Sequence, residues 1–253
     1  MDINEIKKNK TNDYFLKYSS SSVKENINAE LGTIEKDACG LFGKFDKEAF
    51  RGKKIFDILI NKDFETVLDL GAGKLEATME FIKYGKTVDI CDFNDSIYYK
   101  NANCNKKKIN NFYFGNFLDI SFNKTYDALW CSHVLEHQLN PGIFLKKIHS
   151  LIKENGYLSI IVPPRKPIIV GGHVSIWNAG LLLYHLVHAG FDCSEAIVYQ
   201  YDYNIGIIIK KKSIKLPKLH FDMGDIIKLG EFLPKCLSTN KDSFNGDILK
   251  LNH

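Results

Sequence analysis

The sequence lacks several features of secreted, membrane or disulfide-rich proteins. Its six cysteines form no C-x-x-C pair, which argues against a structural zinc site or a disulfide framework and suits a reducing cytosol. The opening stretch MDINEIKKNK has no apolar core, so it does not indicate a secretory signal. The longest apolar run, NAGLLLYHLVHAGF, contains two histidines and is too short to span a membrane. We therefore expect a cytoplasmic protein without a membrane partner.

A strong excess of one charge is also missing. The formal net charge is +4, from 34 lysines and arginines against 30 aspartates and glutamates. This falls short of the basic surface of a nucleic-acid binder, although it would help to hold an anionic small molecule. With 45% hydrophobic and 25% charged residues, the 253-residue chain has ordinary globular composition and can bury a sizeable core.

From Glu65 onward, apolar β-branched runs alternate with segments of helical spacing. The sequence predicts strands at 66–71, 87–92, 111–117, 126–131 and 157–164, helices at 74–85, 94–104, 140–156 and 175–190, and a hairpin from 195–201 and 204–210. This order is typical of an α/β fold with a doubly wound, mostly parallel sheet, here of seven strands ending in an antiparallel hairpin. The residues before it are typical of an N-terminal helical extension.

Two helices carry clear boundary signals. The helix at 140–156 has Asn140 as its expected cap, Pro141 in its first turn and Gly156 at its end. The helix at 175–190 has Ser175 as its expected cap and Gly190 at its end. Both helices follow predicted strands and would cover a face of the sheet.

The first predicted strand ends in the glycine-rich turn DLGAGKLEA. Gly71 and Gly73 allow a tight turn and a close approach of the backbone to a ligand. A dinucleotide fingerprint would need a further glycine where Glu76 stands, and Asp69 would repel a pyrophosphate. Both features suit a ligand with an ammonium and a sulfonium group, although such a turn can also be only a turn.

These motifs, taken in order, resemble class I S-adenosylmethionine-dependent methyltransferases. VLDLGAGKLEA is similar to motif I of that family, and VDICD ends in Asp92, 23 residues after Asp69, where the family places the acid that binds the ribose hydroxyls. FGNFLDISF and YDALWCSHVLEH are similar to the family's later motifs, and the resemblance covers roughly residues 63–212. It departs from the family at Leu75, in place of a third glycine, and at Asn116, where aspartate is commoner.

The resemblance implies a Rossmann-like methyltransferase fold and S-adenosyl-L-methionine as cofactor, with S-adenosyl-L-homocysteine as product. The cofactor-binding residues that it implies are Asp69, Gly71, Gly73, Asp92, Phe93, Asn116, Phe117 and Cys131. Asp89 is the alternative ribose ligand, and Phe117 could equally be a packing residue. We prefer Asp92 because it lies at the end of its strand.

The stretch HVLEH raises a competing hypothesis. On a helix, His133 and His137 would share a face and could bind zinc, with Glu136 polarising a water molecule, as in inverted zinc peptidases. The preceding strand ends at Cys131, however, and Pro141 begins the next helix, which leaves too little room for a regular helix. We therefore expect no metal site.

Methyl transfer to a hydroxyl requires a base, and histidine is the side chain best suited to this near neutral pH. The candidates are His133, His137 and His173, although each could be an ordinary loop histidine. Arg165 and Lys166 could hold a phosphate or carboxylate of the acceptor. Tyr18 is a further candidate for contact with the substrate, because the resemblance implies that the N-terminal segment folds over the cofactor as a lid.

We expect three parts in a monomer or homodimer. Residues 1–62 form an N-terminal helical segment or lid, 63–212 the S-adenosylmethionine-binding core, and 213–253 an extension that packs on the core. The expected reaction is methyl transfer to a small molecule. The resemblance implies, as its acceptor, an oxygen of a phosphorylated or nucleotide-linked sugar, or a phosphate or phosphoramidate group, in bacterial surface-polysaccharide biosynthesis. The alternatives are a methyltransferase acting on a small amine or a nucleic acid, and a catalytically silent methyltransferase-like partner subunit.

Overall fold

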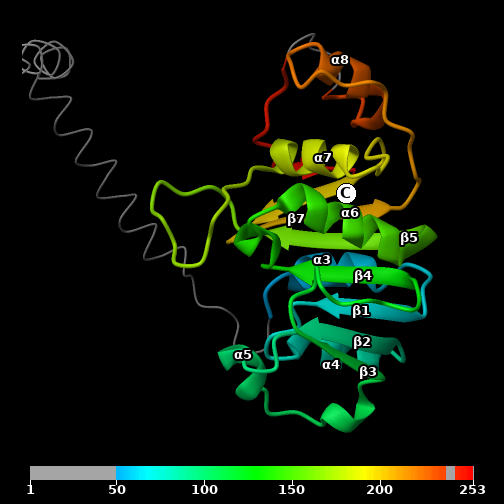
Figure 1. Ribbon diagram of the computed structural model, residues 1–253, viewed down its shortest axis with the longest axis vertical. Helices are drawn as coiled ribbons and strands as arrows, with labels where there is room; N and C mark the ends of the chain where they lie inside the picture. Colours follow the sequence, from blue (N-terminus) through cyan, green and yellow to red (C-terminus); the bar gives the residue numbers. More distant parts are fainter. Residues whose placement is uncertain (1–49, 238–242, 253) are drawn as a thin grey trace, which may run out of the picture. The chain divides into compact units, whose positions relative to one another are not determined.

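The computed structural model describes residues 50–237 and 243–252, in which eight strands form one mixed sheet of order β3-β2-β1-β4-β5-β7-β6-β8 (Figure 1). The strands are β1 (Thr66–Leu70), β2 (Thr87–Asp92), β3 (Asn111–Phe114), β4 (Tyr126–Ser132), β5 (Ile152–Val162), β6 (Ile197–Tyr201), β7 (Asn204–Lys210) and β8 (Lys250–Leu251). The five strands from β3 to β5 run parallel, and the last three pair antiparallel. The predicted α/β fold with a closing hairpin is confirmed.

The helices lie between the strands and cover both faces of the sheet. They are α3 (Lys53–Leu59), α4 (Glu76–Lys83), α5 (Ile97–Lys100), α6 (Pro141–Leu151), α7 (Ala179–His188) and α8 (Asp225–Leu229), with short 3-10 turns η1 (Lys106–Lys108), η2 (Leu135–His137) and η3 (Gly230–Phe232). Among the helices that the structure describes, none has the length and apolar content needed to cross a bilayer.

Alternate side chains of the central strands pack into two separate cores. On β4, Ala128 and Trp130 pack with α3 and α4, whereas Leu129 and Cys131 pack with α6 and α7 on the opposite face. Parallel strands that are buried on both faces are expected to be apolar throughout, which is why their sequence runs were recognisable.

The predicted count of seven strands is wrong by one. The additional strand, β8, comes from the C-terminal segment, where Leu251 pairs with Val198 and Lys250 pairs with Tyr199 of β6. The edge strand β6 would otherwise present unpaired backbone groups, and two residues of the tail satisfy part of that edge. So short a strand carries no recognisable sequence pattern.

Two predicted helix boundaries are also wrong. The helix α6 ends at Leu151, and Gly156 lies inside β5, where a Cβ atom would come within 2.7 Å of the Asp127 carbonyl oxygen. The glycine therefore permits close strand packing and does not end a helix. The helix α7 begins at Ala179, and its cap is Asn178, whose side chain accepts a hydrogen bond from the Leu181 N–H.

The helix predicted at 94–104 is the single turn α5, and the helix predicted at 74–85 is α4. Leu75, which replaces the family's third glycine, precedes α4 in the left-handed conformation, with φ at 65°. Its side chain is fully buried in the core beneath α4. Burial of this leucine offsets the conformational strain that glycine would avoid.

The strand β7 crosses directly beneath α3 at Gly206. A Cβ atom at this position would lie 2.2 Å from Cγ1 of Ile55, which is itself fully buried. The glycine thus allows α3 to dock on the sheet beside the hairpin.

We expect Gly206→Ala to lower the free energy of unfolding by about 1–3 kcal/mol, because the added methyl group overpacks the contact with Ile55. Gly142→Ala in α6 is the matched control, since the methyl group added there would meet nothing within 4 Å. The control should be neutral or stabilising by up to about 1 kcal/mol. Urea denaturation of both variants measures the difference, and equal stabilities would contradict the packing argument.

Candidate active site

The turn after β1 lies at the carboxyl edge of the parallel strands. Gly71 has φ at 75°, and a Cβ atom there would lie 2.1 Å from Cγ2 of Val134, which follows β4. The Gly71 N–H donates a hydrogen bond to the Cys91 carbonyl of β2 over 2.8 Å. Gly73 also has a positive φ, of 49°. The turn therefore needs glycine for its conformation and, at Gly71, for space.

Asp92 ties the end of β2 to this turn. Its Oδ2 accepts a hydrogen bond from the Gly73 N–H over 2.6 Å, and its Oδ1 accepts one from the Phe93 N–H over 2.7 Å. Burial raises the pKa of Asp92, and these two hydrogen bonds oppose that effect. The ring of Phe93 is 53% exposed beside it.

Asp89, the alternative ribose ligand, lies deeper in the same strand. Its carboxylate accepts hydrogen bonds from the Asn110 amide over 2.7 Å and the Tyr126 hydroxyl over 2.8 Å, and it forms an ion pair with Lys124. Asp89 is therefore committed to contacts inside the fold, whereas Asp92 stands at the strand end.

Asp69 is the third acid at this edge and is almost completely buried, with 2% of its surface exposed. Burial raises its pKa to about 7, while a hydrogen bond from the Thr78 hydroxyl lowers it and the nearby charge of Asp92 raises it further. Asp69 and Asp92 thus form an acidic pair beside the glycine turn.

The other residues predicted at the cofactor lie in different surroundings. The exposed Asn116 side chain donates to Asp119 and accepts from the Leu118 N–H. Phe117 is buried, with its ring 5.0 Å from that of Phe144 between centroids. Cys131 is fully buried on the face of the sheet covered by α6 and α7. Neither Phe117 nor Cys131 reaches the surface of the site.

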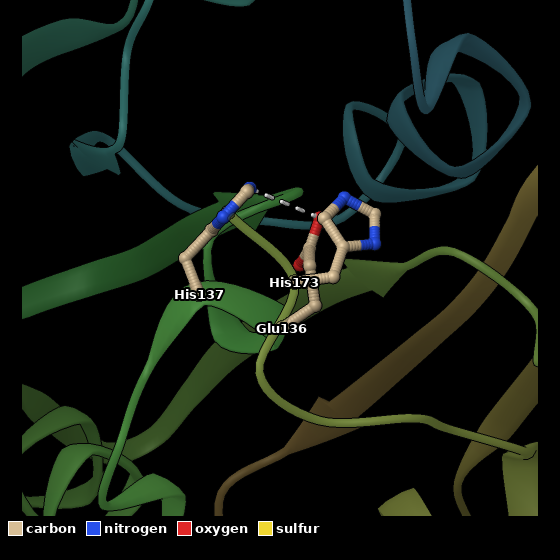
Figure 2. A group of neighbouring side chains, drawn as sticks. All are labelled: Glu136, His137 and His173. Carbon is tan, nitrogen blue, oxygen red and sulfur yellow. Dashed lines mark ion pairs between the residues drawn. The ribbon is translucent and has the colours of Figure 1, made fainter. Parts of the chain in front are cut away.

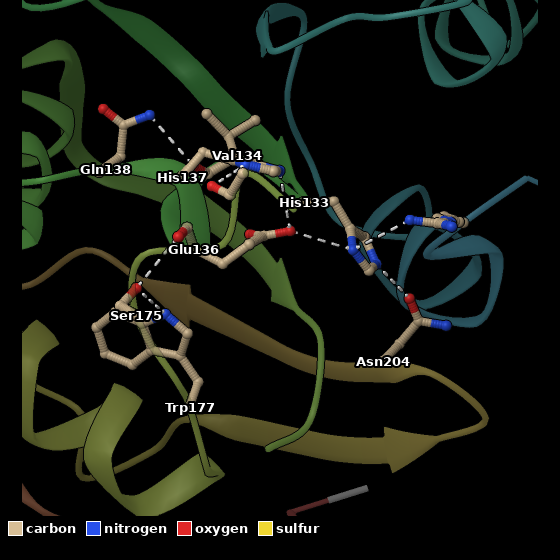
Figure 3. Close-up of polar contacts among 10 residues, drawn as sticks. His133, Val134, Glu136, His137, Gln138, Ser175, Trp177 and Asn204 are labelled. Atoms are coloured by element: carbon tan, nitrogen blue, oxygen red, sulfur yellow. Dashed lines mark hydrogen bonds and ion pairs between the residues drawn. The ribbon is translucent and has the colours of Figure 1, made fainter. Parts of the chain in front are cut away.

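The sequence predicts that the stretch HVLEH does not form a regular helix, and the structure agrees. His133 follows β4 with φ at 56°, and the next residues form only the 3-10 turn η2. The two histidines therefore do not share a helical face. His133 reaches Asn204 on β7, with Nε2 2.9 Å from Oδ1 (Figure 3).

Glu136 lies between these two histidines and is fully buried (Figure 3). Its Oε1 is 3.4 Å from Nδ1 of His133 and 3.7 Å from Nε2 of His137. From the sequence, Glu136 enters only as part of the rejected zinc motif. The signal that could have found it is the presence of an acid between two histidines.

His173 joins the same group from the loop after β5. Its ring packs edge-to-face on that of His137, with 4.9 Å between the ring centres (Figure 2). Nδ1 of His137 lies 2.7 Å from the Gly172 carbonyl oxygen. Burial lowers the pKa of His173, although the charge of Glu136 opposes this effect. The three predicted histidines, His133, His137 and His173, therefore lie around Glu136, and we call these four residues the histidine group.

The basic residues divide between two places. Lys166 lies 4.1 Å from the centre of the Tyr203 ring, and Arg51, which no sequence motif indicates, lies 5.8 Å from the same ring. The Tyr203 ring in turn stacks on that of His133. Arg165 instead forms an exposed ion pair of 2.8 Å with Asp247. Lys166 and Arg51 thus lie beside the histidine group, whereas Arg165 contacts the C-terminal segment.

Tyr18 and residues 1–49 of the predicted N-terminal segment lie outside the described residues, whereas residues 50–62 are described and contain α3. Two surface hollows lie at the opposite edge of the sheet. One is lined by Asp63, Asp127 and Lys153, near the starts of β4 and β5. The other is lined by Lys62 and Asp192, near the end of β7. The acidic pair, the glycine turn and the histidine group are therefore the candidate site. They offer carboxylates for a cationic ligand and imidazoles for proton transfer.

A family model described as a methyltransferase domain matches residues 68–160, which extend from β1 into β5. No curated protein matches the chain. Among solved structures, the chain is similar to 1,6-didemethyltoxoflavin-N1-methyltransferase from Burkholderia thailandensis with bound 1,6-didemethyltoxoflavin and S-adenosylhomocysteine. The TM-score is 0.54 at 15% identity, covering 74% of this chain and 88% of that one.

Two further solved structures are similar. A complex between the Haloferax volcanii Trm112 methyltransferase activator and the putative methyltransferase gives a TM-score of 0.52 at 14% identity, covering 72% of this chain and 97% of that one. Human N-acetylserotonin methyltransferase in complex with S-adenosylmethionine gives 0.51 at 17% identity, covering 64% of this chain and 52% of that one. The chain spans between 52% and 57% of the length of several solved structures that it matches.

The raised pKa of Asp69 makes a prediction about stability. Between pH 4 and pH 7 the folded protein keeps a proton on Asp69 that the unfolded chain releases, so the stability contributed by this group falls as the pH rises. Asp69→Asn removes this dependence. The stability of the variant relative to the unchanged protein should therefore rise between pH 4 and pH 7, by on the order of 2–4 kcal/mol.

Urea denaturation across this pH range, without added ligand, measures the change. The matched control is Asp95→Asn, an exposed aspartate on the loop after β2. If the Asp69→Asn difference stayed constant with pH, the raised pKa would be wrong.

Proposed function

We propose that this chain, which carries a class I S-adenosylmethionine-dependent methyltransferase domain, methylates an oxygen atom of a phosphorylated or nucleotide-linked sugar. The observation that carries the proposal is the pairing of Arg51 and Lys166 around Tyr203, next to His133. Two cations beside the histidine group suit an acceptor with a phosphate, which binds strongly to charged donors. The sequence resemblance suggests bacterial surface-polysaccharide biosynthesis as the setting, with a phosphate or phosphoramidate group as a related acceptor.

The residues at the glycine turn fit the cofactor. When bound, S-adenosylmethionine supplies a methyl group on a positively charged sulfur. We assign the backbone of Gly71 and Gly73 to its cationic methionine end, with the buried Asp69 supplying negative charge beneath the turn, and Asp92 to the ribose hydroxyls. A methyl group at Gly71 would overlap Val134, so glycine is required there for the turn to pack against the segment after β4. The buried acids favour a cation because they are costly to ionise alone.

The adenine end is assigned by position in the fold. Asn116 follows β3 with an exposed amide that can read the base, and Phe93 offers an exposed ring beside Asp92. Phe117 and Cys131 are buried, so we assign them to packing beneath the cofactor and not to direct contact.

The histidine group serves the acceptor. As the acceptor oxygen bonds to the methyl carbon and the carbon–sulfur bond breaks, the hydroxyl proton must leave, and an imidazole of this group would take it. His137 is accessible to an acceptor, with 42% of its side chain exposed. His133 is more enclosed and is held by Asn204. Alignment of acceptor and methyl group supplies the rest of the catalysis.

The cofactor assignment predicts that Asp92→Asn weakens the binding of S-adenosylhomocysteine on the order of tenfold or more, because the amide loses the charged acceptor for the ribose hydroxyls. Isothermal titration calorimetry measures this affinity. Asp95→Asn, on the same loop but exposed, should bind as the unchanged protein does. Equal affinities of Asp92→Asn, Asp95→Asn and the unchanged protein would show that Asp92 does not contact the ribose.

The acceptor assignment predicts methylation of sugar phosphates or nucleotide-linked sugars, but not of the same sugars without phosphate. Mass spectrometry after incubation with S-adenosylmethionine measures the product. Arg51→Gln and Lys166→Gln should each raise the KM on the order of tenfold, since each removes one charged contact. Lys100→Gln, an exposed lysine on α5, is the control.

Methylation of a nitrogen is the competing outcome, because the Burkholderia neighbour is an N1-methyltransferase. A panel of small amines and RNA therefore accompanies the sugars. Methylation of an amine or of RNA, with none of a phosphorylated sugar, would overturn the proposed acceptor.

A further inference from the structure

We propose that Glu136, His137 and His173 form a binding site for a divalent transition-metal cation, with zinc as the representative ion (Figure 2). One carboxylate oxygen of Glu136 and one ring nitrogen of each histidine all lie within 4.8 Å of one another. Two imidazoles and a carboxylate are a ligand set typical of zinc and of non-haem iron(II). This proposal replaces our expectation from the sequence that the chain holds no metal.

The first argument concerns the carboxylate of Glu136. It is fully buried, and neither oxygen accepts a hydrogen bond from any residue that the structure describes. A buried carboxylate without donors is costly unless a charge balances it. The histidines are the groups placed to do so. Nε2 of His137 lies 3.7 Å from Oε1, beyond hydrogen-bond length, and Nδ1 of His133 lies 3.4 Å from it, at the limit of that length.

The second argument concerns the proton on His137. The Gly172 carbonyl can only accept, so Nδ1 of His137, 2.7 Å away, donates to it. In the neutral imidazole, Nε2 then carries a lone pair, and this lone pair faces Oε1 of Glu136. Two acceptors that face each other repel, and a cation between them converts the repulsion into coordination. A backbone carbonyl that fixes the tautomer of a histidine ligand is a common second contact at metal sites.

The third argument concerns how the loop that carries His173 is held. The Val174 and Ser175 N–H groups donate to the Glu136 backbone carbonyl over 2.8 and 3.3 Å. The base of the loop is closed by a hydrogen bond from the Arg165 N–H to the Trp177 carbonyl over 2.9 Å. The backbone therefore fixes two of the ligand-bearing segments together before any ion binds, as a metal site requires.

The spacing of the three ligand atoms is close to that of a metal site. Zinc bonds to nitrogen and oxygen of about 2.0–2.2 Å separate neighbouring ligand atoms by about 3.4 Å. Small rotations of the His137 and His173 side chains, both partly exposed, would contract the group to that size. His133 stays outside it, because Nε2 is held by Asn204 and Nδ1 lies 3.5 Å from the Arg51 guanidinium.

Three protein ligands leave zinc with at least one open position, as in catalytic sites. An acceptor oxygen bound there would lose its proton more readily. Because His137 and His173 would act as ligands, His133 is the imidazole of the histidine group left to take that proton. This consequence rests on the proposed function, whereas the binding of the ion does not.

The test is direct titration of zinc into the full chain after treatment with a chelator, by isothermal titration calorimetry and elemental analysis. We expect one zinc ion per chain. His173→Gln removes a ligand from an exposed part of the loop and should weaken binding at least about tenfold. His220→Gln, an exposed histidine outside the group, should bind zinc as the unchanged protein does. Cobalt(II) absorption provides a second readout, since four-coordinate nitrogen and oxygen ligation gives visible bands.

Circular dichroism and S-adenosylhomocysteine titration of each variant establish that the fold and cofactor site are intact. Failure to bind zinc, or equal binding by His173→Gln and His220→Gln, would overturn the metal site. If the protein bound S-adenosylhomocysteine but not zinc, the metal proposal alone would fail. If it bound zinc at this group but methylated no phosphorylated sugar, the proposed function alone would fail.

Discussion

The close approach of Gly71 to Val134 is the constraint on which the site depends. The turn after β1 can pass beneath the segment after β4 only because Gly71 carries no side chain. The same turn is fixed by the Cys91 carbonyl and by Asp92, both from β2. Val134 in turn immediately precedes the 3-10 turn η2, which carries Glu136. One contact thus joins the glycine turn to the histidine group.

Much of the fold could be predicted because its central strands are buried on both faces and their sequence runs are continuous and apolar. The errors fall where tertiary contacts override local signals. Gly156 looks like a helix end but is required by the Asp127 carbonyl in the neighbouring strand. Ser175 looks like a helix cap but contacts the Glu136 carbonyl, which leaves capping to Asn178. The strand β8 is too short for any pattern to reveal.

The candidate site was predictable in its parts but not in its arrangement. Each histidine could be nominated because it follows a strand, yet their common partner Glu136 becomes visible only when the loop after β5 folds back. Arg51 lies 82 residues before His133 in the sequence, so no local pattern links them. Arg165 is the opposite case, because it pairs with Asp247, equally distant along the chain, and not with the histidine group.

The C-terminal segment contacts the loop after β5, the start of α7 and the strand β6. Asp247 holds Arg165 at one end of the loop after β5, the Gly246 carbonyl accepts a hydrogen bond from the Gly180 N–H at the start of α7, and β8 pairs with β6. The glycine turn follows β1 and is held by β2, and in the strand order both strands are separated from β5, β7, β6 and β8 by β4. Under the proposed function, exchange of this tail and loop between related proteins would alter the choice of acceptor and leave the methyl-donor side unchanged, so one fold could take on new substrates.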